Sequence, residues 1–128
     1  MQIDSIIGEL LLRNNCVVVP KFGGFIATQT SATIDYVSGK MLPPKKSILF
    51  NKQLTNNDGL LLSTYASKYN CSYEEASELI ENQVKEWFES LNQGTRITID
   101  KVGFIYLDNE KNVRFEQDRF FNLLLQSF

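Results

Sequence analysis

Carboxylates are the main side chains of this sequence whose type suggests catalysis, because the chain contains no histidine. Two pairs are candidates for general acid–base chemistry: Asp4 with Glu9, and Asp100 with Asp108. Nothing near either pair supplies a nucleophile or a polarised partner, and the missing imidazole removes the commonest general base and the commonest zinc ligand. We therefore predict a protein that is not an enzyme, with no catalytic residue, no metal, no cofactor and no small-molecule substrate.

The two cysteines, Cys16 and Cys71, are too few for a disulfide framework, and we interpret both as reduced thiols. The N-terminus lacks the positive and apolar regions of a signal peptide. The longest apolar runs fall far short of the ~18 residues that a membrane span needs. We expect a cytoplasmic location, or the cytoplasmic face of a membrane-anchored protein, and no direct membrane contact in this segment.

A short lysine-rich stretch is the clearest candidate for binding. Lys40, Lys45 and Lys46 surround Pro43 and Pro44, and they could contact DNA phosphates or an acidic protein. Three lysines release few counterions, so binding through them alone would be weak and sensitive to salt. The alternative is a solvated loop edge that lysine and proline protect from aggregation.

The distribution of charge argues against a general DNA-binding role. Residues 1–54 carry a net charge of +3, residues 55–128 carry −5, and the whole chain carries −2. A nucleic-acid-binding domain of this size is normally basic, with a pI above about 9, whereas the pI of this sequence is about 5.1. We expect DNA binding to be weak or absent and a protein partner, unidentified from the sequence, to be the main ligand.

Glutamates cover one face of the segment 74–89, and this face is a second candidate for docking a partner, in this case a basic one. A solvated helix face is the alternative. The residues proposed for partner docking are Glu74, Glu78, Glu81 and Glu89.

A repeated segment gives more information on architecture than any single residue does. The segment 17–26 returns in altered form as 97–105, and each copy is followed by a strand that contains a phenylalanine, Phe50 or Phe115. The Phe22-Gly23-Gly24-Phe25 turn looks like a phosphate-binding loop, but it lacks the Lys-Ser/Thr and the spacing of a P-loop and opens no helix. The turn glycines of the two copies are Gly23, Gly24 and Gly103. We interpret these glycines as structural.

The spacing of apolar residues predicts the order of the elements. They are a helix at 3–14, strands at 16–19 and 24–28, a polar excursion at 29–46 that is either an arm or a long loop, a strand at 47–51, a helix at 56–69, a long helix from Ser72, two strands around a tight turn at 108–111, and a last helix from about Asp118.

Helix boundaries and buried faces follow from the same pattern. Thr55 with Asp58, and Ser72 with Glu75, have the spacing of capping boxes, and Gly94 is placed to end the long helix. The predicted buried stripe of that helix is Ala76, Leu79, Ile80, Val84, Trp87, Phe88 and Leu91. The last helix is apolar on all sides and therefore predicted to be buried, either over the first half's sheet or against another chain. Its apolar residues are Phe120, Phe121, Leu123, Leu124, Leu125 and Phe128.

The segment from Leu61 to Leu125 resembles the bacterial histone-like HU/IHF fold, because its two helices lead into the run 94–104, a hairpin and a terminal helix. The first half shares the Phe22-Gly23-Gly24-Phe25 turn, and 38–50 is similar to the stretch in which the family's arm returns. The motifs at 10–26 and 51–59 resemble the tandem HU-like domains at the N-terminus of bacterial proteins that often end in a sporulation-related (SPOR) repeat.

This resemblance implies an α+β fold made of two HU/IHF-like half-folds in one chain, packed as an intramolecular pseudo-dimer. The first half, 1–57, would be truncated and would carry an arm at 29–46. The second, 58–128, would have lost its arm, and the helix near 56–69 would be shared. Trp87 and Phe88 should lie where the halves meet, because the apolar stripe of the long helix is too wide for one small hairpin.

Departures from the family pattern shape the expected function. HU and IHF grip DNA with two arms whose tip proline wedges between base pairs, but 30–35 has neither arginine nor proline, and the second arm is missing. We expect a non-enzymatic interaction module in the cytoplasmic part of an envelope-anchored, peptidoglycan-associated protein. The alternatives are a DNA-binding architectural protein of the HU/IHF type and a purely structural dimerisation domain.

Overall fold

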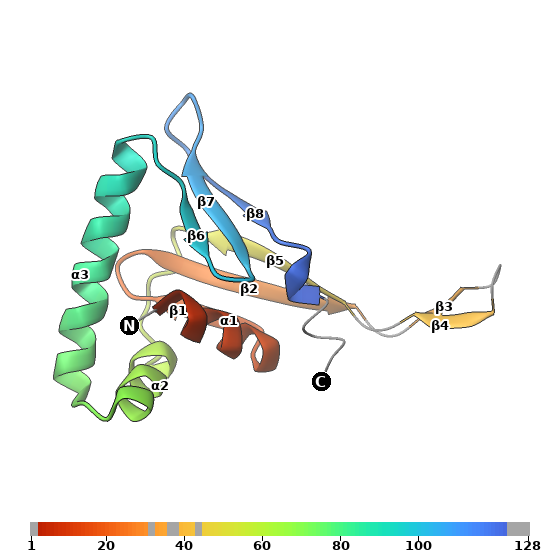
Figure 1. Ribbon diagram of the computed structural model, residues 1–128, viewed down its shortest axis with the longest axis horizontal. Helices are drawn as coiled ribbons and strands as arrows, with labels where there is room; N and C mark the ends of the chain where they lie inside the picture. Colours follow the sequence, from red (N-terminus) through yellow and green to blue (C-terminus); the bar gives the residue numbers. More distant parts are fainter. Residues whose placement is uncertain (1–2, 31–32, 36–38, 43–44, 123–128) are drawn as a thin grey trace.

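The computed structural model describes residues 3–30, 33–35, 39–42 and 45–122. Over these residues the fold is α+β, as the sequence predicts. Two three-stranded antiparallel sheets lie beside three helices, and a narrow ribbon extends away from the body (Figure 1).

The first half of the chain forms one helix and one sheet. Helix α1 (Ile3–Arg13) precedes strands β1 (Cys16–Val19), β2 (Gly23–Thr30) and β5 (Lys45–Asn51), which form a sheet in the order β1-β2-β5. The helix buries the residues that the sequence places on one face: Ile3, Ile6, Ile7, Leu10 and Leu11. This apolar face packs against β1 and against elements of the second half, and its burial is what the apolar spacing predicts.

The polar excursion at 29–46 contains an arm. Strand β2 continues to Thr30, where it still pairs with Lys45 of β5. Beyond that pair, β3 (Thr33–Asp35) and β4 (Lys40–Leu42) form a separate two-stranded ribbon, with Asp35 opposite Lys40. Figure 1 shows this ribbon far from the rest of the protein, so of the two alternatives the structure has the arm.

The second half contains two helices and a second sheet. Helices α2 (Leu60–Tyr69) and α3 (Tyr73–Asn92) precede strands β6 (Ile97–Ile99), β7 (Gly103–Leu107) and β8 (Val113–Gln117), in the sheet order β6-β7-β8. Strands β7 and β8 are joined by the short turn 108–112, so this hairpin, described in full, carries no arm.

The two predicted capping boxes have different outcomes. At Ser72 the box is present: the Ser72 hydroxyl accepts from the Glu75 amide at 3.1 Å, and the Glu75 carboxylate accepts from the Ser72 amide at 3.2 Å. The box predicted at Thr55 is wrong. Helix α2 starts only at Leu60, and its N-cap is Gly59 in a left-handed conformation. Asp58 Oδ1 accepts from the Leu60 amide at 3.0 Å, so Asp58 bonds to the first turn of the helix and not back to Thr55.

The buried stripe of α3 is narrower than predicted. Five of its residues are buried: Ala76, Ile80, Val84, Trp87 and Leu91. Leu79 and Phe88 are 41% and 40% exposed, so their assignment to the stripe is wrong. The buried residues recur every three or four positions and so form one stripe along the helix, and Leu79 and Phe88 lie at the edges of this stripe. A helix that packs on a small sheet buries only one such stripe.

One hydrophobic core joins the two halves. Phe22, in the turn between β1 and β2, has its ring centroid 5.1 Å from that of Trp87 on α3. Phe25 of β2 lies 5.7 Å from Phe115 of β8. Trp87 therefore lies at the junction, as predicted, and Phe88 reaches the same place through Phe22 at 5.3 Å while staying partly exposed.

The start of the last helix is described for three residues, 120–122. Phe121 is buried against the core, but Phe120 is 55% exposed, which contradicts the prediction of a helix buried on every side. The other predicted core residues of this helix lie outside the described residues: Leu123, Leu124, Leu125 and Phe128.

Replacing Trp87 with alanine tests the shared core. Because Trp87 is only 9% exposed and contacts Phe22 of the other half, we expect Trp87→Ala to lower the free energy of unfolding by about 3–5 kcal/mol in a denaturant titration. Phe88→Ala, at a neighbouring but exposed position, is the control and should cost clearly less. A loss below about 1 kcal/mol for Trp87→Ala would show that this side chain is peripheral.

Candidate functional site

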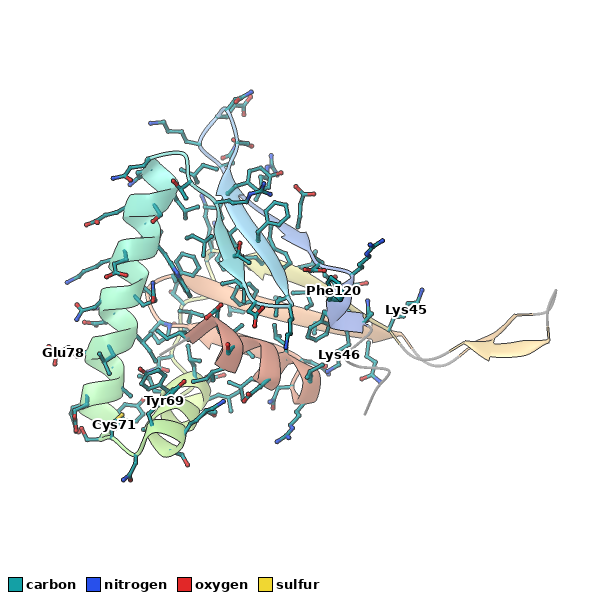
Figure 2. The ribbon with its side chains drawn as sticks, in the orientation of Figure 1. Lys45, Lys46, Tyr69, Cys71, Glu78 and Phe120 are labelled. Carbon is teal, nitrogen blue, oxygen red and sulfur yellow. The ribbon has the colours of Figure 1, made fainter. Side chains whose placement is uncertain are left out.

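The base of the arm holds two of the three candidate lysines. Lys45 begins β5 and is exposed, whereas Lys46 is buried with only 4% of its surface accessible. Both lie where the ribbon leaves the body (Figure 2). Lys40 begins β4 on the arm itself, and Pro43 and Pro44 lie outside the described residues. Lys40 and Lys45 therefore remain as candidate contacts.

Lys46 makes internal contacts instead of facing solvent. Its Nζ donates to the carbonyl oxygens of Leu11 at 2.9 Å and Leu12 at 3.1 Å. These carbonyls belong to the last turn of α1, which has no helical donors for them, and a cation there also favours the negative end of the helix dipole. Burial lowers the pKa of Lys46. The side chain thus ties β5 to α1, and its ammonium is not available to a partner in this conformation.

The backbone of β5 beside Lys46 is bonded to side chains of the second half. The Lys46 amide donates to Asn122 Oδ1 at 2.9 Å, and the Ile48 amide donates to Gln117 Oε1 at 2.9 Å. Gln117 Nε2 in turn donates to the Lys46 carbonyl at 3.0 Å. Two side-chain amides therefore bond to β5 as a neighbouring strand would. Sequence reasoning missed both, because a glutamine and an asparagine near a helix start carry no pattern that names their distant partners.

The acidic face of α3 lies away from the arm. Glu74, Glu78 and Glu89 are exposed, and Figure 2 shows Glu78 on the opposite side of the body from Lys45. Glu81 differs from them, because its carboxylate binds the Lys21 ammonium at 2.7 Å. This hydrogen bond, together with the charge of Lys21, lowers the pKa of Glu81. The exposed Lys45 and the exposed glutamates of α3 therefore lie on separate parts of the protein.

The turn glycines serve the two sheets in the same way. A side chain at Gly23 would overlap the ring of Phe50, and one at Gly103 would overlap the Glu116 carbonyl and the ring of Phe115. The preceding lysine of each turn has a left-handed backbone, with φ of 64° at Lys21 and 65° at Lys101. Gly24 is likewise covered, since a side chain there would meet Leu54. These close approaches give all three glycines a packing role.

Three of the four carboxylates considered for catalysis, those of Asp4, Glu9 and Asp108, have structural partners. Asp4 accepts from the Asp100 amide at 3.3 Å, and Glu9 pairs with Lys68 at 2.9 Å. Asp108 shapes the β7–β8 turn: it accepts from the Asn112 amide, which does most to lower its pKa, and it pairs with Arg114 at 2.9 Å. Among the described residues, no group of three or more His, Cys, Asp or Glu is placed to hold a metal ion.

The two cysteines are free thiols. Burial raises the pKa of Cys16, and the nearby charge of Asp58 raises it further. A thiol with a raised pKa is less often the reactive thiolate, so this environment disfavours Cys16 as a nucleophile.

Comparison with known families agrees with the repeated architecture. The family model described as CCDC81-like prokaryotic HU domain 1 matches residues 1–58, and the one described as CCDC81-like prokaryotic HU domain 2 matches residues 59–128. The chain belongs to the CCDC81-like prokaryotic HU domains. Its two tandem HU-like domains thus account for both sheets and for the repeated turn. No curated protein and no solved structure matches the chain.

Within the described ranges of this HU-like pair, no helix is long and apolar enough to cross a bilayer.

The different environments of Lys46 and Lys45 give a matched pair of variants. Lys46→Met keeps an unbranched apolar side chain but leaves the Leu11 and Leu12 carbonyls without their donor. We expect this change to lower the free energy of unfolding by about 1–3 kcal/mol. Lys45→Met, at an exposed position, should stay within about 0.5 kcal/mol of the parent. Equal effects in thermal or denaturant unfolding would contradict the anchoring role of Lys46.

Proposed function

We propose that this HU-like pair is a non-enzymatic module that binds a protein partner through its single arm and binds duplex DNA weakly or not at all. The observation that carries the proposal is the difference between the two hairpins. One extends into the ribbon of β3 and β4, whereas the other closes in the turn 108–112. Asp108 holds that turn by accepting from the amides of Glu110 and Asn112, each at 2.9 Å.

The free energy needed to deform DNA argues against a DNA-bending activity of the HU type. Wedging side chains into a duplex costs a few kcal/mol for each unstacked step, and wrapping the bent DNA around the protein offsets that cost. A single arm can supply a wedge on one side only. The phosphate contacts are also few, because Lys46 is buried and only Lys40 and Lys45 remain of the candidate lysines. Affinity from two lysines falls steeply as salt is added.

DNA binding remains the alternative function, and membership of an HU family is the observation that favours it. An architectural role would need the arm to enter a groove while the body contacts the backbone. The acidic α3, with its exposed Glu74 and Glu78, would have to face away from the duplex.

We also propose that the halves pack as the subunits of an HU dimer do, with a boundary near residue 57 and with α2 serving both. Similar sheet orders, β1-β2-β5 and β6-β7-β8, support this arrangement. Contacts of α2 with α1 and β1 on one side and with α3 on the other support the shared helix. An experimental structure in which no twofold rotation superposes the two sheets would contradict it.

The setting of the module follows from the sequence resemblance and is likewise a proposal. We infer that the module is the cytoplasmic N-terminal part of an envelope-anchored, peptidoglycan-associated protein of the SPOR type. The support is the tandem HU-like motif at 10–26 and 51–59. Fractionation of cells that express the full-length gene should place the protein with the membranes, and a wholly soluble product would contradict this setting.

A DNA titration tests the main proposal. At about 150 mM salt, fluorescence anisotropy with a labelled duplex should show no binding tighter than the micromolar range of non-specific contacts. Any residual binding should be lost when Lys40 and Lys45 are both changed to glutamate. Lys111→Glu, an exposed lysine on the β7–β8 turn, is the matched control and should have no effect.

Submicromolar affinity that depends on Lys40 and Lys45 would favour the architectural alternative. A pull-down from cells with the same variants tests the proposed binding of a protein partner. A partner retained by the parent and by Lys111→Glu, but lost with Lys40→Glu/Lys45→Glu, would agree with the proposal. A partner that all variants retain equally would place the contact elsewhere.

A further inference from the structure

One residue at the base of the arm has three of its groups held by other parts of the chain. The Lys46 amide is bound by Asn122, its carbonyl by Gln117, and its ammonium by the last turn of α1. Ile48, two residues further along the same strand, has its amide bound by Gln117 as well. Lys46 is next to Lys45, which forms the last pair between β5 and β2 before the arm.

We propose that Gln117 and Asn122 are positioning residues for the arm, so that the second HU-like domain sets the direction in which the arm of the first one points. This inference depends on the proposed function in one respect only, namely that the arm binds a partner. The anchoring itself follows from the hydrogen bonds at Lys46 and Ile48.

The physical argument starts from the edge of the sheet. In the order β1-β2-β5, strand β5 has a neighbour on one side only, and the polar groups on its other side require partners. Gln117 meets this need with both ends of its amide, as acceptor for Ile48 and donor to Lys46, which fixes the plane of the amide against the strand. Asn122 adds one acceptor at Lys46.

The location of these bonds makes them effective. They lie where the ladder between β2 and β5 ends at the pair Thr30 and Lys45. Figure 1 shows that the ribbon of β3 and β4 extends far from the body on the side where these bonds lie, so they act at the base of the arm. Lys46 restrains the same point from the opposite element, α1, through its side chain.

Two near-isosteric variants remove the clamp without changing charge. Gln117→Met and Asn122→Leu keep side-chain size but lose every hydrogen-bonding atom at the contact. In the double variant we expect the Lys46 and Ile48 amides to exchange with solvent about tenfold faster. We also expect smaller residual dipolar couplings for the amides of β3 and β4, while those of α3 stay unchanged. Asn82→Leu, an exposed asparagine on α3, is the matched control.

Conservative replacements separate positioning from general stability. Asn122→Asp keeps an acceptor oxygen for the Lys46 amide and should retain its slow exchange. Gln117→Glu keeps the acceptor for Ile48 but places a carboxylate beside the Lys46 carbonyl, so it should loosen the arm. If the double variant fails to fold, the single variants carry the same comparison, because each removes only part of the clamp.

Arm couplings that keep their parent values in Gln117→Met/Asn122→Leu, with the body folded, would overturn the proposal. So would equal loosening by Asn122→Leu and Asn122→Asp, since only the first loses the acceptor. None of these readouts needs a bound partner. The anchor can therefore be correct even if Lys40 and Lys45 bind nothing, and the two proposals fail separately.

Discussion

Burial of Phe22 is the interaction on which the two-domain structure depends. Its ring lies 5.3 Å from Phe50 of its own sheet and 5.1 Å from Trp87 of the other half. Domains of about 60 residues bury a modest share of their surface and are marginally stable when alone. The first half gains burial in two ways, because its aromatic turn packs against the long helix of its neighbour and α2 packs against β1. The second sheet completes this joint core through Phe115 against Phe25.

Once the core is shared, the outer surfaces are free to differ. The first half keeps its arm and a net positive charge, whereas the second half closes its hairpin with Asp108 and carries glutamates along α3. These differences do not disturb the packing, because exposed charges at a protein surface contribute little to stability. Similar domains can therefore hold unlike surfaces on opposite sides of one body, as the separation of Lys45 from Glu78 in Figure 2 illustrates.

Periodicity and turn residues predicted the elements well, since α1, the capping box at Ser72 and the repeated glycine turns depend on neighbours in the sequence. The failures have longer-range causes. The exposure of Phe88 depends on how much of α3 the first half covers, and the burial of Lys46 depends on where α1 ends in space. In the sequence, Lys46 lies after two prolines and just before a predicted strand, which is typical of a surface residue. Its burial becomes evident only when the Leu11 and Leu12 carbonyls are located in space. The roles of Gln117 and Asn122 could not be predicted either, because their hydrogen-bond partners on β5 are far away in the sequence.

The segment 52–59, which joins β5 to α2, changes the thermodynamics of assembly. Separate subunits dissociate on dilution, so the stability of an ordinary dimer depends on protein concentration. A covalent joint makes the association of the halves intramolecular, at an effective concentration that dilution does not alter. The packing of the two halves should thus be independent of protein concentration, with one arm for each pair of halves. A few molecules per cell would keep the same fold and the same stoichiometry as an abundant pool.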